Sequence, residues 1–123
     1  MQLDTLIKST NALLTPERFH DYAPNGLQVE GRQEVRRIVT GVSACLDLIL
    51  AARERSADAV FVHHGWFWKR EDPRITGVRR KRISALLSAD MSLVAYHLPL
   101  DDHPELGNNA LLGRELGFIA DGR

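Results

Sequence analysis

The chain has 123 residues, of which 44% are hydrophobic and 26% are charged, and these proportions are typical of one soluble globular domain. Its 16 basic and 16 acidic residues cancel, so the net charge gives no reason to expect a nucleic acid or an anionic membrane as partner. The single cysteine, Cys45, excludes an internal disulfide, and no segment has the length of a membrane span or the pattern of a secretory signal. We therefore expect a cytoplasmic protein in which residues 1–123 form a single domain.

Helical and extended patterns alternate in the first part of the chain. Residues 2–14 place leucine and isoleucine close to helical spacing and predict an amphipathic helix. A turn signal at residues 24–26 precedes a short predicted strand at residues 27–30. Residues 38–42 are β-branched and mostly apolar, which predicts a buried strand, and residues 45–56 return to helical spacing.

The second part of the chain repeats this alternation. Residues 59–62 and 93–96 predict two further buried strands, separated by a predicted helix at residues 78–89. Asn108 is expected to cap a last helix, which Gly117 would terminate. Strands that alternate with helices predict an α/β fold, with parallel crossovers for at least some strands. The helix at 78–89 is expected to place four apolar side chains in the core: Val78, Ile83, Leu86 and Leu87.

Side chains that can bind metals follow two consecutive apolar strands. The strand at 59–62 runs into His63 and His64, and the strand at 93–96 runs into His97 and then Asp101. In open α/β sheets the loops at the carboxyl ends of the strands converge on one crevice, so these two groups can meet. Imidazole and carboxylate together suit Zn, Fe, Mn or Ni better than the all-oxygen ligand shell of Ca. The pattern predicts a divalent-metal site at this edge of the sheet.

The two adjacent histidines impose a geometric condition. Along a regular strand, neighbouring side chains point to opposite faces, because the side-chain period is two. His63 and His64 could share one site if the strand ends between them, and Gly65 would permit a turn there. Asp101 could bridge two metals, because a carboxylate offers two oxygens.

Each candidate residue also has an ordinary structural interpretation. A histidine pair at a strand end serves more often as a hydrogen-bonding surface than as a pair of ligands. His97 can be a half-buried histidine bonded to backbone, and Asp101 can be a helix-capping charge. The aromatic residues 66–68 can wall a pocket for a planar ring, or they can pack against a helix or a subunit. No glycine-rich phosphate-binding loop is present, so no nucleotide cofactor is expected.

Three segments resemble one known family, in the same order along the chain. They are residues 21–31 (DYAPNGLQVEG), residues 63–69 (HHGWFWK) and residues 96–109 (YHLPLDDHPELGNN). Together they resemble the GTP cyclohydrolase I type 2 homologues, the YbgI-like dinuclear metal-binding proteins. The resemblance runs over essentially the whole chain.

The resemblance implies a mixed-sheet α/β fold of two similar repeats, a homohexamer, and two divalent metal ions (Fe, Zn, Mn or Ni) per complete site. Carried over by motif, His63, His64 and Asp101 fall on metal-ligand positions. His97 falls beside the site, where it would support the ligands or transfer protons. Family members carry a second half with a His-x-x-x-Glu motif, so this chain resembles the first half only. Five further residues match signature positions without a catalytic role: Asp21, Asn25, His103, Glu105 and Asn108.

Three functions are compatible with these features. The family resemblance implies a metal-dependent hydrolase acting on a small molecule; the family name suggests GTP, and a phosphoester would suit two metals equally well. The alternative is a metal-binding interaction or regulatory protein without turnover. The third is a non-functional remnant, for which an exposed sheet edge would predict aggregation.

Overall fold

The computed structural model describes residues 1–119 and 121–122, and within them four strands form one mixed sheet. The strand order is β1-β4-β3-β2, with β2, β3 and β4 mutually parallel and β1 antiparallel to β4. This arrangement confirms the predicted α/β class and the parallel crossovers. In chain order, the elements are α1 (Leu3–Leu14), the 3₁₀ turn η1 (Pro16–Arg18), β1 (Gly26–Val29), β2 (Ile38–Ser43), α2 (Leu46–Glu54), β3 (Ala59–His64), α3 (Gly77–Ser88), β4 (Ser92–Ala95), α4 (Leu98–Asp102) and α5 (Asn108–Glu115).

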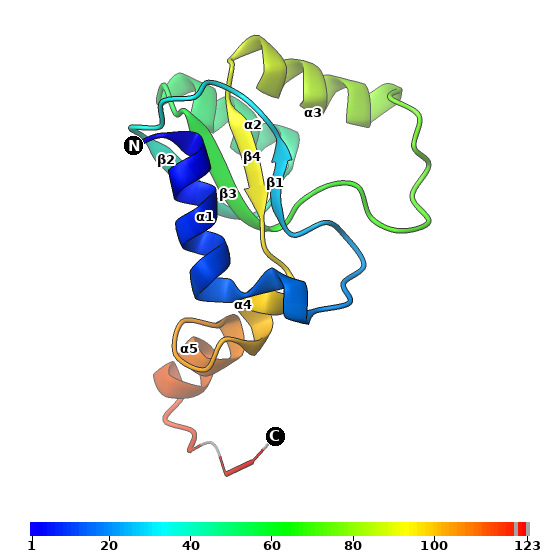
Figure 1. Cartoon of the computed structure of the whole chain (residues 1–123). Coiled ribbons are helices and arrows are strands. Elements are labelled where there is room, and N and C mark those ends of the chain that lie inside the picture. Colours follow the sequence, from blue (N-terminus) through cyan, green and yellow to red (C-terminus); the bar gives the residue numbers. More distant parts are fainter. Residues whose placement is uncertain (120, 123) are drawn as a thin grey trace.

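Helices cover both faces of the sheet (Figure 1), with α1 on one face and α2 and α3 on the other. The side-chain period of two divides each central strand between the two faces. Val60 and Leu93 enter the cluster on the α2 and α3 side, whereas Phe61 and Val94 pack toward α1. Strands buried on both faces are expected to be apolar along their whole length, which explains the continuous apolar runs of β3 and β4. No helix among the described residues is long and apolar enough to cross a membrane.

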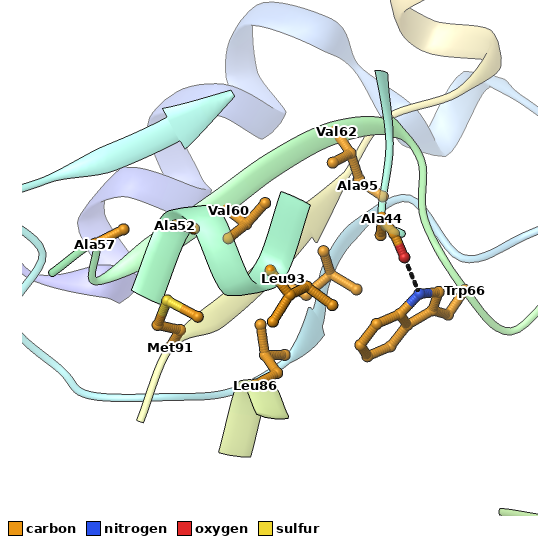
Figure 2. Close-up of a cluster of buried hydrophobic side chains, with 11 residues drawn as sticks. Ala44, Ala52, Ala57, Val60, Val62, Trp66, Leu86, Met91, Leu93 and Ala95 are labelled. Atoms are coloured by element: carbon orange, nitrogen blue, oxygen red, sulfur yellow. Dashed lines mark hydrogen bonds between the residues drawn. The ribbon is translucent and has the colours of Figure 1, made fainter. Parts of the chain in front are cut away.

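The larger core cluster lies between the sheet and the helices α2 and α3 (Figure 2). Leu86 of α3 meets Leu93 of β4 there, and both are fully buried. Trp66 closes the cluster near the histidines, with 6% of its surface exposed and its indole Nε1 donating to the carbonyl of Ala44 at 2.9 Å. Trp66 therefore packs in the core and does not line a pocket for a planar ring among the described cavities.

Several apolar residues predicted to be buried are exposed. The predicted strand at 38–42 is confirmed as β2, but its predicted burial is wrong, because β2 lies at the edge of the sheet, where Ile38 is 40% and Val42 is 68% exposed. The prediction for the helix at 78–89 is wrong for Val78 and Leu87, which are 59% and 55% exposed. An apolar run predicts a strand or a helix, but the packing of neighbouring elements decides which of its residues are covered.

The chain after β4 also departs from the prediction. Residues 98–102 form the short helix α4, which was not predicted, with Pro99 in its first turn. Gly107, not Asn108, is the N-cap of α5, and a Cβ at Gly107 would lie 2.6 Å from the carbonyl oxygen of Leu100. Gly117 follows the helix with φ of +71°, as its predicted role in termination requires.

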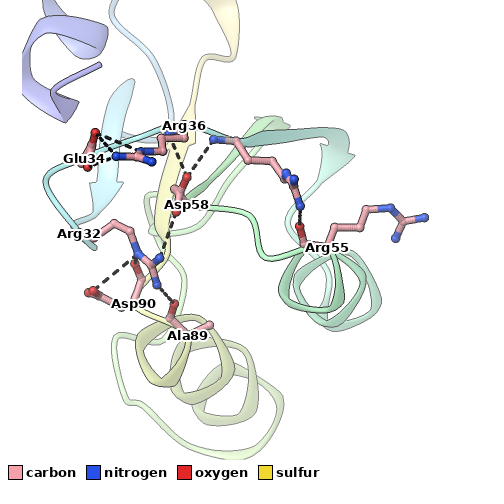
Figure 3. A network of polar contacts seen from close by, with 8 residues as sticks. Arg32, Glu34, Arg36, Arg55, Asp58, Ala89 and Asp90 are labelled. Atoms are coloured by element: carbon pink, nitrogen blue, oxygen red, sulfur yellow. Dashed lines mark hydrogen bonds and ion pairs between the residues drawn. The ribbon is translucent and has the colours of Figure 1, made fainter.

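A buried carboxylate fixes the segment before β2 to the start of β3. Figure 3 shows Asp58 between the guanidinium of Arg32 and the backbone of the segment that contains Arg36. Asp58 accepts the backbone N–H groups of Arg36 and Arg37 at 2.8 Å each, and the Arg32 side chain at 3.1 Å. Burial alone would raise the pKa of Asp58, but these hydrogen bonds and the charge of Arg32 outweigh it and lower the pKa.

This environment predicts a pH-dependent stability. We expect Asp58→Asn to reduce the free energy of unfolding near neutral pH and to have less effect as the pH falls. A carboxyl whose folded-state pKa is lowered stabilises the fold above its ordinary pKa of about 3.9 and loses that effect as pH falls through the folded-state pKa. Urea unfolding of the wild type and the variant, from about pH 7 to about pH 3, measures this difference.

The matched control is Asp4→Asn, at a carboxylate whose side chain is 70% exposed. Its effect on the free energy of unfolding should stay within about 0.5 kcal/mol. The lowered pKa of Asp58 would be contradicted if the difference in the free energy of unfolding between the wild type and Asp58→Asn stayed constant from about pH 7 to about pH 3.

Candidate metal centre

Three histidine rings converge at the carboxyl edge of the two central strands. His63 and His64 are the last two residues of β3, and His97 follows β4. The ring centroid of His63 lies 4.4 Å from that of His64 and 5.0 Å from that of His97. The centroids of His64 and His97 are 5.6 Å apart. One nitrogen from each ring lies within 4.8 Å of the others. The structure thus brings together the two histidine groups that the sequence placed at separate strand ends.

The strand does not end between the two adjacent histidines, so the condition considered for a shared site is not met, yet the two rings do lie together. β3 runs through His64, which is in register with Ser43 of β2. Both residues lie at the end of β3, and their ring centroids are 4.4 Å apart.

Gly65 is tightly enclosed by β1 and β4. A Cβ at this position would lie 2.3 Å from Gln28 Oε1 and 2.6 Å from the Cβ of Ala95. Gln28 accepts the backbone N–H of Trp66 at 2.6 Å and donates through Nε2 to the carbonyl of Trp66 at 3.1 Å. The amide of Gln28 therefore clamps the loop that follows the histidines. The sequence pattern predicts that Gln28 lies on a strand, but it does not predict this contact.

His63 and His64 are each held through Nδ1. Nδ1 of His63 lies 3.1 Å from the carbonyl oxygen of Tyr96, which only accepts, so this nitrogen carries the proton. Nδ1 of His64 lies 3.2 Å from the hydroxyl of Ser43. Holding one ring nitrogen orients the other, Nε2, which is how metal-binding histidines are usually fixed.

Asp101 reaches the cluster from the short helix α4. Its Oδ1 lies 3.5 Å from Nε2 of His63, and the Asp101 side chain is 31% exposed. Asn108 donates to the same oxygen at 3.2 Å, and Asn109 donates to the Asp101 carbonyl at 3.2 Å. Asn108, predicted to be a helix cap, therefore contacts the carboxylate of the site. His103 lies in the turn after α4, where its Nδ1 accepts backbone N–H groups.

His97 is held by residues from the loop before β1. Its Nδ1 lies 2.8 Å from Oδ1 of Asp21, and its backbone N–H donates to the side-chain oxygen of Asn25 at 2.7 Å. Asp21 also accepts the backbone N–H groups of Leu98 and Tyr22. Burial opposes ionisation, but the hydrogen bonds from His97, Asn25 and these two amides lower the pKa of Asp21 to about 2.

Trp68 lies beside the histidines. Its ring meets that of His97 edge-on, with centroids 5.0 Å apart and an interplanar angle of 83°, and its centroid is 6.0 Å from that of His64. Its Nε1 donates to the carbonyl of Gly65 at 3.2 Å. The aromatic segment therefore divides: Trp66 packs in the core, and Trp68 borders the site.

The electrostatics favour the neutral imidazole of His64. Burial lowers the pKa of His64, and the nearby His63 and His97 lower it further, against the opposing effect of Asp101. Neutral imidazole is the form that binds a metal through its lone pair. His64 is therefore in the ligand-competent form at neutral pH.

The donor set fits a divalent transition metal. Ligand atoms at about 2.0 Å from a tetrahedral ion lie about 3.3 Å from one another, so nitrogens within 4.8 Å need only small ring rotations. Three imidazoles with an adjacent carboxylate suit Zn, Fe, Mn or Ni and do not resemble the oxygen cage of Ca.

An apolar cavity opens next to the cluster. It has a volume of about 400 Å³, and His63 forms part of its wall. The surrounding side chains come from α1, β2, β3 and α4: Leu14, Thr40, Val42, Phe61 and Leu100. A small molecule in this cavity would lie against one of the candidate ligands.

The chain is similar to proteins of one known family. The family model described as "Duf34/NIF3 (NGG1p interacting factor 3)" matches residues 1–121. The chain is 55% identical over 120 residues to a "GTP cyclohydrolase 1 type 2 homolog" of Pseudomonas aeruginosa, and 59% identical over 114 residues to the protein of that name from Allochromatium vinosum. These alignments cover 98% and 93% of this chain but 48% and 45% of those proteins, so the chain spans about half the length of these relatives.

A solved structure described as "protein ybgI, unknown function" superimposes with a TM-score of 0.98 at 50% identity. It is matched over 100% of this chain and 50% of that one, which agrees with the predicted resemblance to one repeat of a larger fold. The resemblance inferred from three sequence segments is confirmed, and the chain belongs to the DUF34/NIF3 family, among the GTP cyclohydrolase 1 type 2 homologues.

Proposed function

We propose that this chain supplies part of a divalent-metal centre of hydrolytic type, with His63, His64 and Asp101 as ligands and His97 as the residue that transfers protons. One observation carries the proposal: nitrogens of three histidines lie within 4.8 Å, and the Asp101 carboxylate lies 3.5 Å from one of them. Burial and the two neighbouring histidines lower the pKa of His64, which favours the neutral form of imidazole that binds a metal.

The side chains have distinct roles in this proposal. When bound, a divalent metal supplies a Lewis acid and lowers the pKa of a water toward about 7. The carbonyl of Tyr96 orients the ring of His63, and Ser43 contacts that of His64. His97 presents Nε2 to the same space and can accept a proton there and return it. Trp68 packs edge-on against the ring of His97.

Three ligands do not fill the coordination shells of two metals. We therefore propose that a site with two divalent ions (Fe, Zn, Mn or Ni) is completed by groups outside these residues. The family relatives are about twice as long, and a homo-oligomer, a hexamer by the family resemblance, is part of the same proposal. A cytoplasmic location also belongs to it, supported by the single cysteine.

The substrate proposed for this centre is a small molecule. The printed name of the relatives refers to GTP, and an aromatic base would find Trp68 beside the histidines. A phosphoester suits a two-metal centre equally well. The apolar cavity beside His63 would hold the part of the molecule that does not react.

A second function is favoured by the family description itself. "NGG1p interacting factor 3" names an interaction and not a reaction. A metal-binding interaction or regulatory protein without turnover would use the same ligands. The two functions differ in whether bound metal leads to hydrolysis.

The test of the metal centre is metal content per chain by elemental analysis. We expect the wild type to retain a transition metal and both His63→Ala and Asp101→Ala to lose it. Loss of a group that merely supports a ligand costs about 10–100-fold in affinity, so loss of a ligand should cost on the order of 100-fold or more. His20→Ala is the control, because this histidine is exposed and lies outside the cluster.

A wild type that stays empty after reconstitution with Zn, Fe, Mn and Ni would refute the metal centre. If metal is retained, a panel of nucleotides and phosphoesters separates the two functions. Hydrolysis that is lost in both variants supports the enzyme, and bound metal without any hydrolysis supports the interaction protein.

A further inference from the structure

The pairing of Asp21 with His97 is a buried contact to the one histidine of the cluster that the proposed function does not use as a ligand. We propose that Asp21 is a positioning residue that holds His97 with its proton on Nδ1, so that the Nε2 lone pair faces the space shared with His63 and His64. The inference rests on the proposed function, in which His97 transfers protons at Nε2.

The contact has the geometry of a strong, directed hydrogen bond. Nδ1 of His97 lies 2.8 Å from Oδ1 of Asp21, and the Asp21 side chain is only 3% exposed. An ionised carboxylate has no proton to donate, so the imidazole must supply the one in this bond. Hydrogen bonds to a charged acceptor are roughly twice as strong as neutral ones. The pair therefore selects one tautomer of His97.

The same two side chains also fix the backbone of His97. Asn25 accepts the backbone N–H of His97 at 2.7 Å, and the second oxygen of Asp21 accepts the N–H of Leu98 at 2.9 Å. Asn25 in turn donates to Asp21 at 2.9 Å. The loop before β1 thus holds both the ring and the backbone of His97. Asp21 lies 76 positions before His97 in the chain.

A purely structural role would explain part of this network. Asp21 also accepts the N–H of Tyr22. A buried carboxylate that accepts several backbone N–H groups could have the sole role of holding two loops together. That role predicts a loss of stability in Asp21→Asn. It does not predict a change in which nitrogen of His97 is protonated. The tautomer is therefore the measurement that separates the two roles.

The experiment uses the metal-free full chain labelled with ¹⁵N at histidine, at about two pH units above the ordinary imidazole pKa of about 6.5. Two-bond ¹H–¹⁵N correlation spectra report which ring nitrogen of each histidine is protonated. We expect His97 to be protonated on Nδ1 in the wild type. In Asp21→Asn the ratio of the Nδ1–H to the Nε2–H form should fall by about tenfold or more, on the scale of one charge-assisted hydrogen bond.

The matched control is Asp58→Asn. Asp58 is also buried and also accepts two backbone N–H groups and a cationic side chain, but it lies at the start of β3, in a separate polar network. This variant should lower stability and leave the tautomer of His97 unchanged. His63 is an internal control, because its Nδ1 is bonded to the carbonyl of Tyr96 and should stay protonated in both variants.

Two results would overturn the inference: protonation of His97 on Nε2 in the wild type, or an unchanged tautomer ratio in Asp21→Asn. If Asp21→Asn does not fold, the wild-type spectrum decides alone, since an Nδ1 proton on His97 is required. The metal content of the wild type is measured separately. An empty wild type with the expected tautomers refutes the metal centre but not the positioning of His97 by Asp21.

Discussion

Truncating Leu86 to alanine is expected to lower the free energy of unfolding by about 2–5 kcal/mol, whereas the same change at Leu87 should cost less than about 0.5 kcal/mol. The two residues are neighbours in the last turn of α3, so the change in helix propensity is similar for both. Leu86 is 0% exposed and Leu87 is 55% exposed. The difference between the two variants therefore isolates burial.

The large effect at Leu86 has a definite structural cause. Its side chain lies in the main core cluster with Met91 and Leu93 (Figure 2), and all three are fully buried. Removing its methyl groups takes apolar surface out of the core and leaves a cavity that the rigid central strands cannot close. Domains of this size are stable by about 5–15 kcal/mol, so Leu86→Ala would remove a substantial part of the total.

Urea unfolding followed by tryptophan fluorescence measures both variants, and Trp66 in the same cluster serves as a probe. If both substitutions lowered the free energy of unfolding equally, the packing of Leu86 in the core would be contradicted. A large loss at Leu87 alone would place the opposite face of α3 against the sheet.

Replacing Gly65 by alanine is expected to reduce stability by about 1–3 kcal/mol and metal affinity by about tenfold or more. The added Cβ would lie 2.3 Å from Gln28 Oε1 and 2.6 Å from the Cβ of Ala95. Ala95 belongs to the central strand β4 and cannot give way, and Gln28 is tied to Trp66 by two hydrogen bonds. The backbone after the histidines must therefore shift, which moves His64 relative to the other ligands.

Gly113→Ala is the matched control for this prediction. Nothing lies within 4 Å of a Cβ at Gly113, which is inside α5. Alanine should be tolerated there and should favour the helix by up to about 1 kcal/mol. Urea unfolding and competition for Zn²⁺ with a chromophoric chelator measure the two effects. Wild-type stability and affinity in Gly65→Ala would show that the loop absorbs the extra methyl group without moving the histidines.

The main elements and the location of the candidate site could be predicted from local composition and spacing. The strands at 59–62 and 93–96 are recognisable because strands buried on both faces must be apolar throughout. The convergence of His63, His64 and His97 was predictable because carboxyl ends of neighbouring parallel strands meet at one edge of a sheet. These inferences depend on local composition and on a general rule of α/β topology.

Only the tertiary structure decided which strand lies at the edge and which distant residues hold the histidines in place. An apolar run such as 38–42 looks the same at an edge as in the centre, because strand order depends on long-range pairing. Asp21 and Gln28 carry no sequence pattern that links them to His97 and Trp66, which lie 76 and 38 positions away. Hydrogen bonds between side chains of separate loops exist only after the loops have docked on the sheet, and their partners are set by that docking.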